Sequence, residues 1–136
     1  MAVKFLYFNE LSRKMLSEKK ILIVDDEPDI CFILNGNFSK RGFRTSFTQT
    51  LAEAEIQLEA NTPSVLLLDN HLPDGKGIDV VNKIKSQYPH LKIIMITAHD
   101  SPQDRLKAFS NGIDFFISKP FTISGINQAV DFILEN

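Results

Sequence analysis

Short apolar segments separated by longer stretches of helical character constrain the fold of this chain more than any other feature. Four segments, residues 21–24, 65–68, 93–96 and 115–117, are continuously apolar, and a fifth, FRTSFT from Phe43, alternates apolar and polar residues. A continuous apolar run is typical of a central strand in a parallel sheet, because both faces of such a strand are covered, whereas alternation is typical of an edge strand. The sequence therefore predicts a five-stranded parallel sheet with the FRTSFT strand at an edge.

The stretches between the strands carry helix start and stop signals. These signals are a first-turn proline, capping side chains and terminal glycines, namely Pro28, Thr50 with Glu53, Ser101, Gly42 and Gly112. Another helix is predicted over about residues 78–88, before a proline. Strands that alternate with helices five times predict an α/β fold, a doubly wound, three-layer (βα)5 sandwich. In such folds the functional crevice lies outside the carboxyl ends of the strands.

Apolar stripes on the first and last helices should face the sheet. Their members are Ile30, Ile33, Leu34 and Phe38 in the first helix and Ile123, Ile126, Val130, Ile133 and Leu134 in the last. Phe132 lies about 140° from the centre of the last stripe at 100° per residue. We therefore expect Phe132 to be exposed.

Composition and charge exclude several classes of protein. The chain has 136 residues, 43% hydrophobic and 24% charged, which suits one compact domain. A net charge of −2, with no basic run among aromatic residues, gives no reason for direct binding to nucleic acid. No apolar stretch is long enough to span a membrane. The single cysteine, Cys31, cannot form an internal disulfide, so a cytoplasmic location is expected.

Residues 1–18 precede the first predicted strand and need a separate interpretation. The apolar cluster at residues 5–8 is too short for a secretory signal, and no small-residue cleavage site follows it. Two interpretations stay open: a helical or disordered extension, or a translation-start artefact with Met15 as the native start. Residues 19–136 are predicted to form the folded domain.

Charged and hydroxyl side chains follow four of the five predicted strands. They are Asp25 and Asp26 after the first strand, Asp69 after the third, Thr97 after the fourth and Lys119 after the fifth. Two carboxylates about 4 Å apart repel by roughly 4 kcal/mol at an effective dielectric constant near 20, so this group requires a cation. Lys119 and a bound Mg²⁺, which prefers oxygen ligands, can supply it. Any one of these residues alone would more often be an ordinary turn or surface residue, but their joint occurrence predicts a site.

The segments ILIVDDEPDI, LLLDNHLPDGKGIDVV, IIMITAHD and FFISKPF resemble the CheY-like receiver domain of bacterial two-component response regulators, which has a flavodoxin-like fold. The resemblance implies that Asp69 is the phosphoacceptor, which takes a phosphoryl group from a phosphohistidine of a sensor histidine kinase or phosphotransfer protein. It also implies that Asp25, Asp26, Asp69 and the backbone carbonyl of His71 hold Mg²⁺. Such a domain is a signalling phosphoacceptor rather than an enzyme, although it promotes its own phosphorylation and dephosphorylation.

The same resemblance assigns a switch. It implies that Thr97 and Lys119 contact the phosphoryl group, that Phe116 turns inward when Thr97 moves, and that the Lys119–Pro120 peptide bond is cis. Phe116 has no hydroxyl group, so we expect packing alone to fix its orientation. Phe132 would lie on the face of the fourth helix, fifth strand and fifth helix, which the family uses for dimers and targets.

Several alternatives stay open or are disfavoured by the sequence. A pseudo-receiver that binds partners without phosphorylation is the main alternative. The presence of all five residues of the predicted phosphorylation site argues against it, namely Asp25, Asp26, Asp69, Thr97 and Lys119. A phosphohydrolase with an aspartate nucleophile would need an Asp-x-Asp arrangement after the first strand, and a nucleotide or flavin fold would need a phosphate-binding loop there. His71 and His99 border the site and are interpreted as rim residues that tune the lifetime of the phosphoryl group. A stand-alone receiver and a fragment of a larger regulator are both compatible with the sequence.

Overall fold

A parallel sheet of five strands organises the computed structural model, which describes residues 10–11 and 18–135. The strands are β1 (Lys20–Val24), β2 (Arg44–Thr48), β3 (Val65–Asp69), β6 (Lys92–Thr97) and β7 (Phe115–Ser118). Their order is β2-β1-β3-β6-β7, and every neighbouring pair is parallel. The predicted sheet and its FRTSFT edge strand are confirmed. Apart from residues 10, 11 and 18, the predicted extension at residues 1–18 lies outside the described residues.

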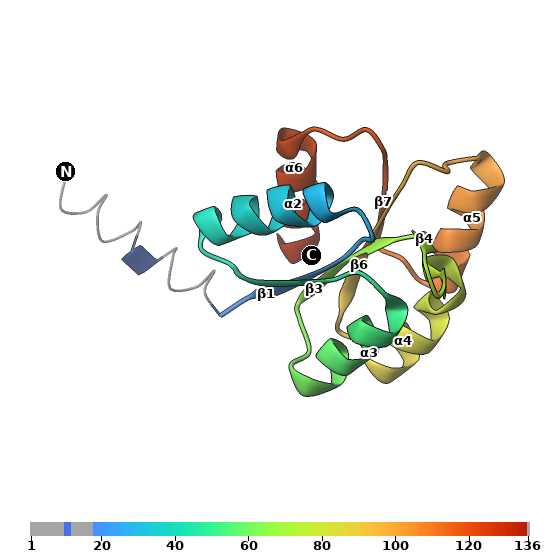
Figure 1. The fold of residues 1–136 in the computed structure, drawn as a ribbon, viewed down its shortest axis with the longest axis horizontal. Helices are drawn as coiled ribbons and strands as arrows, with labels where there is room; N and C mark the ends of the chain where they lie inside the picture. The colour runs from blue at the N-terminus through green and yellow to red at the C-terminus, as the bar shows by residue number, and fades with distance from the viewer. Residues whose placement is uncertain (1–9, 12–17, 136) are drawn as a thin grey trace.

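Helices cover both faces of this sheet (Figure 1). They are α2 (Pro28–Arg41), α3 (Leu51–Ala60), α4 (Val81–Gln87), α5 (Pro102–Asn111) and α6 (Ile123–Glu135). The helices α2 and α6 pack on one face and α3, α4 and α5 on the other, which confirms the predicted three-layer α/β sandwich. Within the described residues, no helix combines the length and apolar character needed to cross a membrane.

Successive strand residues point into two separate cores, which explains why the strands read as continuous apolar runs. In β1, Ile21 and Ile23 pack toward α2 and α6, whereas Leu22 and Val24 pack toward α3, α4 and α5. All four are at most 1% exposed. Since burial of such a side chain contributes about 1.5–3 kcal/mol, the two cores hold the strand ends that carry the site in fixed register.

Helix ends follow the predicted signals. Gly42 has a φ of 103°, in the left-handed region that suits glycine, and its backbone N–H donates to carbonyl groups at the end of α2. The Thr50 hydroxyl accepts a hydrogen bond from the backbone N–H of Glu53 at 3.1 Å, and Ser101 does the same for Asp104 at 3.1 Å. These caps are confirmed.

The segment after β3 differs from the prediction. The single helix predicted at about residues 78–88 is wrong in its first part, which forms a 3-10 turn, η1 (Gly77–Asp79), before α4 begins. A short antiparallel hairpin of β4 (His71–Leu72) and β5 (Gly75–Lys76), which the sequence did not indicate, precedes it. The Asp74 carboxylate between these strands accepts hydrogen bonds from the first two backbone N–H groups of α3, each at 2.9 Å. The hairpin is thereby fastened to the start of a helix.

Two predicted core residues, Ile33 and Ile123, are exposed instead, by 50% and 36% respectively. The buried stripe of α2 runs through Cys31, Leu34 and Phe38, and Ile33 lies about 130° from its centre. Ile123 is the first residue of α6. Both side chains line a pocket at the carboxyl edge of the sheet rather than the core.

Candidate functional site

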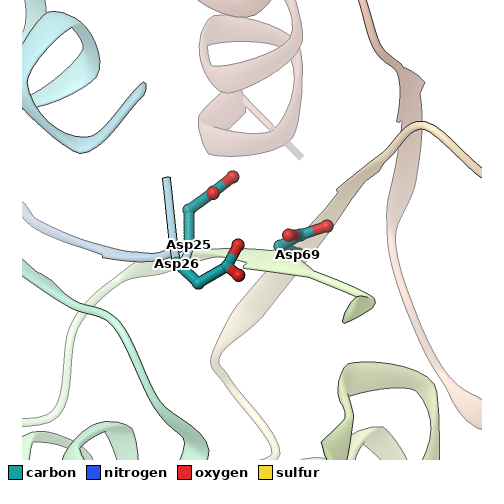
Figure 2. A group of neighbouring side chains, drawn as sticks. All are labelled: Asp25, Asp26 and Asp69. Atoms are coloured by element: carbon teal, nitrogen blue, oxygen red, sulfur yellow. The ribbon is translucent and has the colours of Figure 1, made fainter. Parts of the chain in front are cut away.

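Three carboxylates gather at the carboxyl ends of β1 and β3 (Figure 2). Asp25 and Asp26 directly follow β1, and Asp69 is the last residue of β3. The register pairs Val24 with Leu68, so the two strands end side by side. Carboxylate oxygens of the three residues all lie within 4.8 Å of one another. Asp25 and Asp69 are only 3% and 5% exposed, whereas Asp26 is exposed.

The Lys119 ammonium group is the cation of this cluster. Its Nζ lies 2.9 Å from an Asp25 carboxylate oxygen and 3.6 Å from one of Asp69. The backbone N–H of Lys119 donates to the Thr97 carbonyl at 2.9 Å, which fixes the end of β7 beside β6. The peptide bond between Lys119 and Pro120 is cis. The structure therefore brings residues from four separate strand ends to one place, as the sequence predicts.

Glu27 belongs to the site although the sequence did not single it out. It precedes the first residue of α2, and its carboxylate lies 2.8 Å from the Lys119 Nζ. Its backbone N–H donates to Asp25 at 2.9 Å, which turns the side chain toward the lysine. Asp29, an exposed acid of the same DDEPD run, lies in the first turn of α2. The acidic run offers no pattern that distinguishes the two, because only the direction of the turn separates them.

Burial and mutual repulsion control protonation in the cluster. Burial raises the pKa of Asp69 to about 6, and the negative charges of Asp25 and Asp26 add to this effect. The positive charge of Lys119 and a hydrogen bond from the His71 backbone act in the opposite direction. For Lys119, burial alone lowers the pKa, but hydrogen bonds to Glu27 and Asp25 and the charge of Asp69 outweigh burial and raise it. The ammonium group stays protonated, and the cluster still carries excess negative charge.

Thr97 and Phe116 lie on neighbouring strands behind the cluster. Thr97 ends β6, is 1% exposed, and its hydroxyl accepts a hydrogen bond from the His99 backbone at 3.2 Å. Phe116 lies in β7, is 7% exposed, and packs in the core beside Met95. The guanidinium carbon of Arg105 lies 4.7 Å from the centre of the Phe116 ring. A cation therefore contacts the ring of Phe116 in addition to the core packing expected from the sequence.

The two histidines of the rim contact each other. The ring centres of His71 and His99 are 4.0 Å apart, with 34° between the ring planes. Burial and the neighbouring charges of His99 and Lys76 lower the pKa of His71. The two rings, in contact with each other, therefore line the pocket beside Asp69.

A pocket of about 810 Å³ opens over the cluster and has two chemically different sides. The polar side contains Asp69, Thr97 and Lys119. The apolar side is formed by the first two turns of α2 and the segment after β7, with Ile30, Ile33, Pro120, Phe121 and Ile123. The pocket therefore combines a charged base, with the Lys119 ammonium group beside the carboxylates, and an apolar wall.

Phe132 lies away from this pocket, on α6. Its side chain is 57% exposed, and its ring centre lies 6.2 Å from that of Phe115 in the edge strand β7. The residue is therefore on the face formed by α5, β7 and α6, which corresponds to the fourth helix, fifth strand and fifth helix of the sequence prediction.

Comparison with known sequences gives one family and many relatives. Residues 21–131 match the family model described as the response regulator receiver domain. The chain is 34% identical over 117 residues to the alkaline phosphatase synthesis transcriptional regulatory protein PhoP of Bacillus subtilis, covering 86% of this chain and 49% of that protein. It is 33% identical over 115 residues to the response regulator protein PilR of Pseudomonas aeruginosa, covering 85% of this chain and 26% of that protein. The chain thus spans about half or less of the length of these relatives.

Solved structures show the same architecture. A two-component response regulator from Clostridium difficile superposes with a TM-score of 0.83 at 27% identity, covering 87% of this chain and 97% of that one. The non-phosphorylated HemR receiver domain from Leptospira biflexa superposes with a TM-score of 0.81 at 28% identity, covering 87% and 95%. The CheY-like, flavodoxin-like fold is therefore confirmed.

Proposed function

The chain belongs to the response regulator receiver domain family, and from this membership we propose that Asp69 accepts a phosphoryl group from a phosphohistidine of a sensor histidine kinase or phosphotransfer protein. The observation that carries the proposal is the position of Asp69, a nearly buried carboxylate 3.6 Å from an ammonium group at the base of an open pocket. With its pKa at about 6, Asp69 is mostly ionised at neutral pH and able to act as a nucleophile.

Transfer requires positioning and charge compensation more than covalent chemistry from the protein. A carboxylate oxygen of Asp69 forms the new bond to phosphorus while the bond from phosphorus to the donor imidazole nitrogen breaks. The Lys119 ammonium and the Thr97 hydroxyl both line the same pocket and would hydrogen-bond the phosphoryl oxygens. The apolar side of the pocket would contact the partner that carries the phosphohistidine.

Magnesium is the cofactor that the donor set fits. Asp25, Asp26 and Asp69 offer only oxygen atoms, within 4.8 Å of one another, and hard divalent cations prefer such ligands. The proposed ligands are these three carboxylates and the backbone carbonyl of His71. When bound, Mg²⁺ would offset the negative charge that gathers on the phosphoryl oxygens.

The proposal includes a signalling output. Phosphorylated Asp69 would carry roughly −1.5 to −2 charges in place of the single charge of the carboxylate, by analogy with other phospho-residues, enough to bias a two-state element. That element would be Thr97 with Phe116, and the surface it controls would be the α5, β7 and α6 face, where Phe132 is exposed and where a homodimer could form. The chain would act as a signalling phosphoacceptor in the cytoplasm. A pseudo-receiver scaffold is the competing proposal, and the presence of all five chemical side chains at one edge argues against it.

A protein donor tests the route of transfer. A phosphotransfer domain labelled on its histidine is mixed with this chain and Mg²⁺, and label is expected to move to the wild type and not to Asp69→Asn. Asp29→Asn is the matched control, because Asp29 is an exposed acid in the same DDEPD run. Label on Asp69→Asn equal to that on the wild type would contradict the assignment of the acceptor.

We expect His71 and His99 to tune the rate at which the phosphorylated form is hydrolysed. Their rings line the pocket beside Asp69, where a hydrolytic water would enter, so His71→Ala and His99→Ala should each change the dephosphorylation rate several-fold. The measurement is the decay of the phosphorylated protein after the donor is removed. His90→Ala, at an exposed position lining a different pocket, is the control and should not change the rate. Unchanged rates in both site variants would reject this role.

A further inference from the structure

A guanidinium, a hydroxyl and a carboxylate form a network beside the Phe116 ring. The Arg105 guanidinium donates to the Ser118 hydroxyl at 2.9 Å, and that hydroxyl donates to the Asp100 carboxylate at 2.6 Å. Arg105 Nη2 also lies 3.7 Å from the same carboxylate oxygen. The network therefore joins the segment after β6, the first half of α5 and the end of β7.

The geometry of β7 allows one guanidinium to contact two of its residues. Phe116 and Ser118 are alternate residues of the strand, so their side chains lie on the same face. The Ser118 hydroxyl has a single hydrogen, which it gives to Asp100, and its lone pairs are available to Arg105. Arg105 is thereby oriented with its guanidinium over a ring that is only 7% exposed.

We propose that Arg105 is a positioning residue that holds the Phe116 ring in its buried orientation, and that Asp100 and Ser118 couple this hold to the segment after Thr97. The inference rests on the proposed function, because Thr97 and Phe116 form the switch of that proposal. Asp100 lies three residues after Thr97 in sequence, and Ser118 is the register partner of Thr97. A shift of Thr97 toward a phosphoryl group would displace Asp100. Because Asp100 is hydrogen-bonded to Ser118, and Ser118 to Arg105, the displacement would reach Arg105.

The absence of a hydroxyl on Phe116 makes this contact important. A tyrosine can be held by a hydrogen bond, but a phenylalanine ring offers only its faces and edges, and a cation over the face is the strongest polar contact available to it. A contact of this kind at a half-exposed site shifts the ratio of two ring orientations by about two- to fivefold. The Arg105 side chain is 46% exposed, so replacing it should leave the packing of the core intact.

The test follows the Phe116 ring by NMR in the full chain with ring-labelled phenylalanine, its signal being assigned with Phe116→Leu. Without a phosphoryl donor, Arg105→Gln is expected to raise the population of the second ring orientation by about two- to fivefold, and Arg105→Lys by less. Lys107→Gln is the matched control, because it removes a positive charge from the same helix at a residue paired with Asp79. A ring population in Arg105→Gln equal to that of the control would overturn the inference.

A separate measurement tests the second part of the proposal, the coupling of Arg105 to the segment after Thr97 through Asp100 and Ser118. Acetyl phosphate and Mg²⁺ are added to the wild type and to Ser118→Ala, which removes the hydroxyl that joins Asp100 to Arg105. The change in the Phe116 signal on phosphorylation should be at least halved in Ser118→Ala, and an equal change would overturn the coupling. A wild type that takes up no phosphoryl group would instead contradict the proposed function, and the ring populations measured without a donor would still decide the role of Arg105.

Discussion

Asp69→Asn is expected to raise the free energy of unfolding of the metal-free protein at neutral pH by as much as about 3 kcal/mol. Folding places this carboxylate beside two others and 95% out of solvent contact, which raises its pKa from 3.8 to about 6. The ionised form is therefore disfavoured in the folded state. Asparagine keeps the size and the acceptor oxygen but removes the charge, so the variant should lose the penalty and keep the packing.

The pH dependence gives this prediction a sign that can be checked. The unfolded chain releases the Asp69 proton near pH 3.8 and the folded chain near pH 6. Between these two pH values the folded state therefore binds more protons than the unfolded state. Stability contributed by the protonated carboxyl is therefore lost as the pH rises from about 4 to about 6. Urea unfolding with a chelator present, across this range, should show a fall in wild-type stability that is reduced in Asp69→Asn. Asp29→Asn should keep the wild-type slope, and a variant no more stable than the wild type at neutral pH would contradict the prediction.

Lys119→Met is expected to have the opposite effect and to lower the free energy of unfolding by about 3–5 kcal/mol. The Lys119 side chain is 13% exposed, and its Nζ lies 2.9 Å from a carboxylate oxygen of Asp25 and 3.6 Å from one of Asp69. Its removal leaves two buried carboxylates facing each other without a cation. Part of the cost is relieved when Asp69 takes up a proton, so the pKa of Asp69 should rise further in this variant.

A surface lysine gives the control for that experiment. Lys83 pairs with Glu55 at 3.4 Å, but both side chains are 61% exposed. Such a pair contributes at most about 1 kcal/mol, so Lys83→Met should be nearly neutral. The double variant Asp69→Asn with Lys119→Met should recover part of the loss, because the two groups interact directly. A Lys119→Met variant as stable as Lys83→Met would show that the ammonium group does not balance the cluster.

The parts of this molecule that follow from backbone periodicity were predictable. Continuous apolar runs indicate buried strands, and parallel strands place their carboxyl ends at one edge, so the sequence alone places Asp25, Asp69 and Lys119 together. The caps at Thr50 and Ser101 have local signals, because each bonds a backbone N–H three residues away.

The parts that depend on side-chain direction were not predictable. Glu27 reaches Lys119 because the chain turns at Asp25. Arg105 reaches Phe116 from the helix that precedes β7, a contact that neither a period nor a motif in the sequence indicates. Ile33 fits an apolar stripe in the sequence but lies off the buried face, because Cys31 shifts the centre of that face. A hairpin with strands of two residues is too short to produce a periodic pattern.

Phosphorylation by a small donor tests the central claim most directly, because it needs no partner protein. The chain is incubated with Mg²⁺ and acetyl phosphate, and its intact mass and peptide map are recorded. The account predicts the mass gain of one phosphoryl group, stable in acid and labile in base, located on Asp69 and lacking in Asp69→Asn. A wild type that stays unmodified, or an Asp69→Asn variant modified to the same extent, would contradict it.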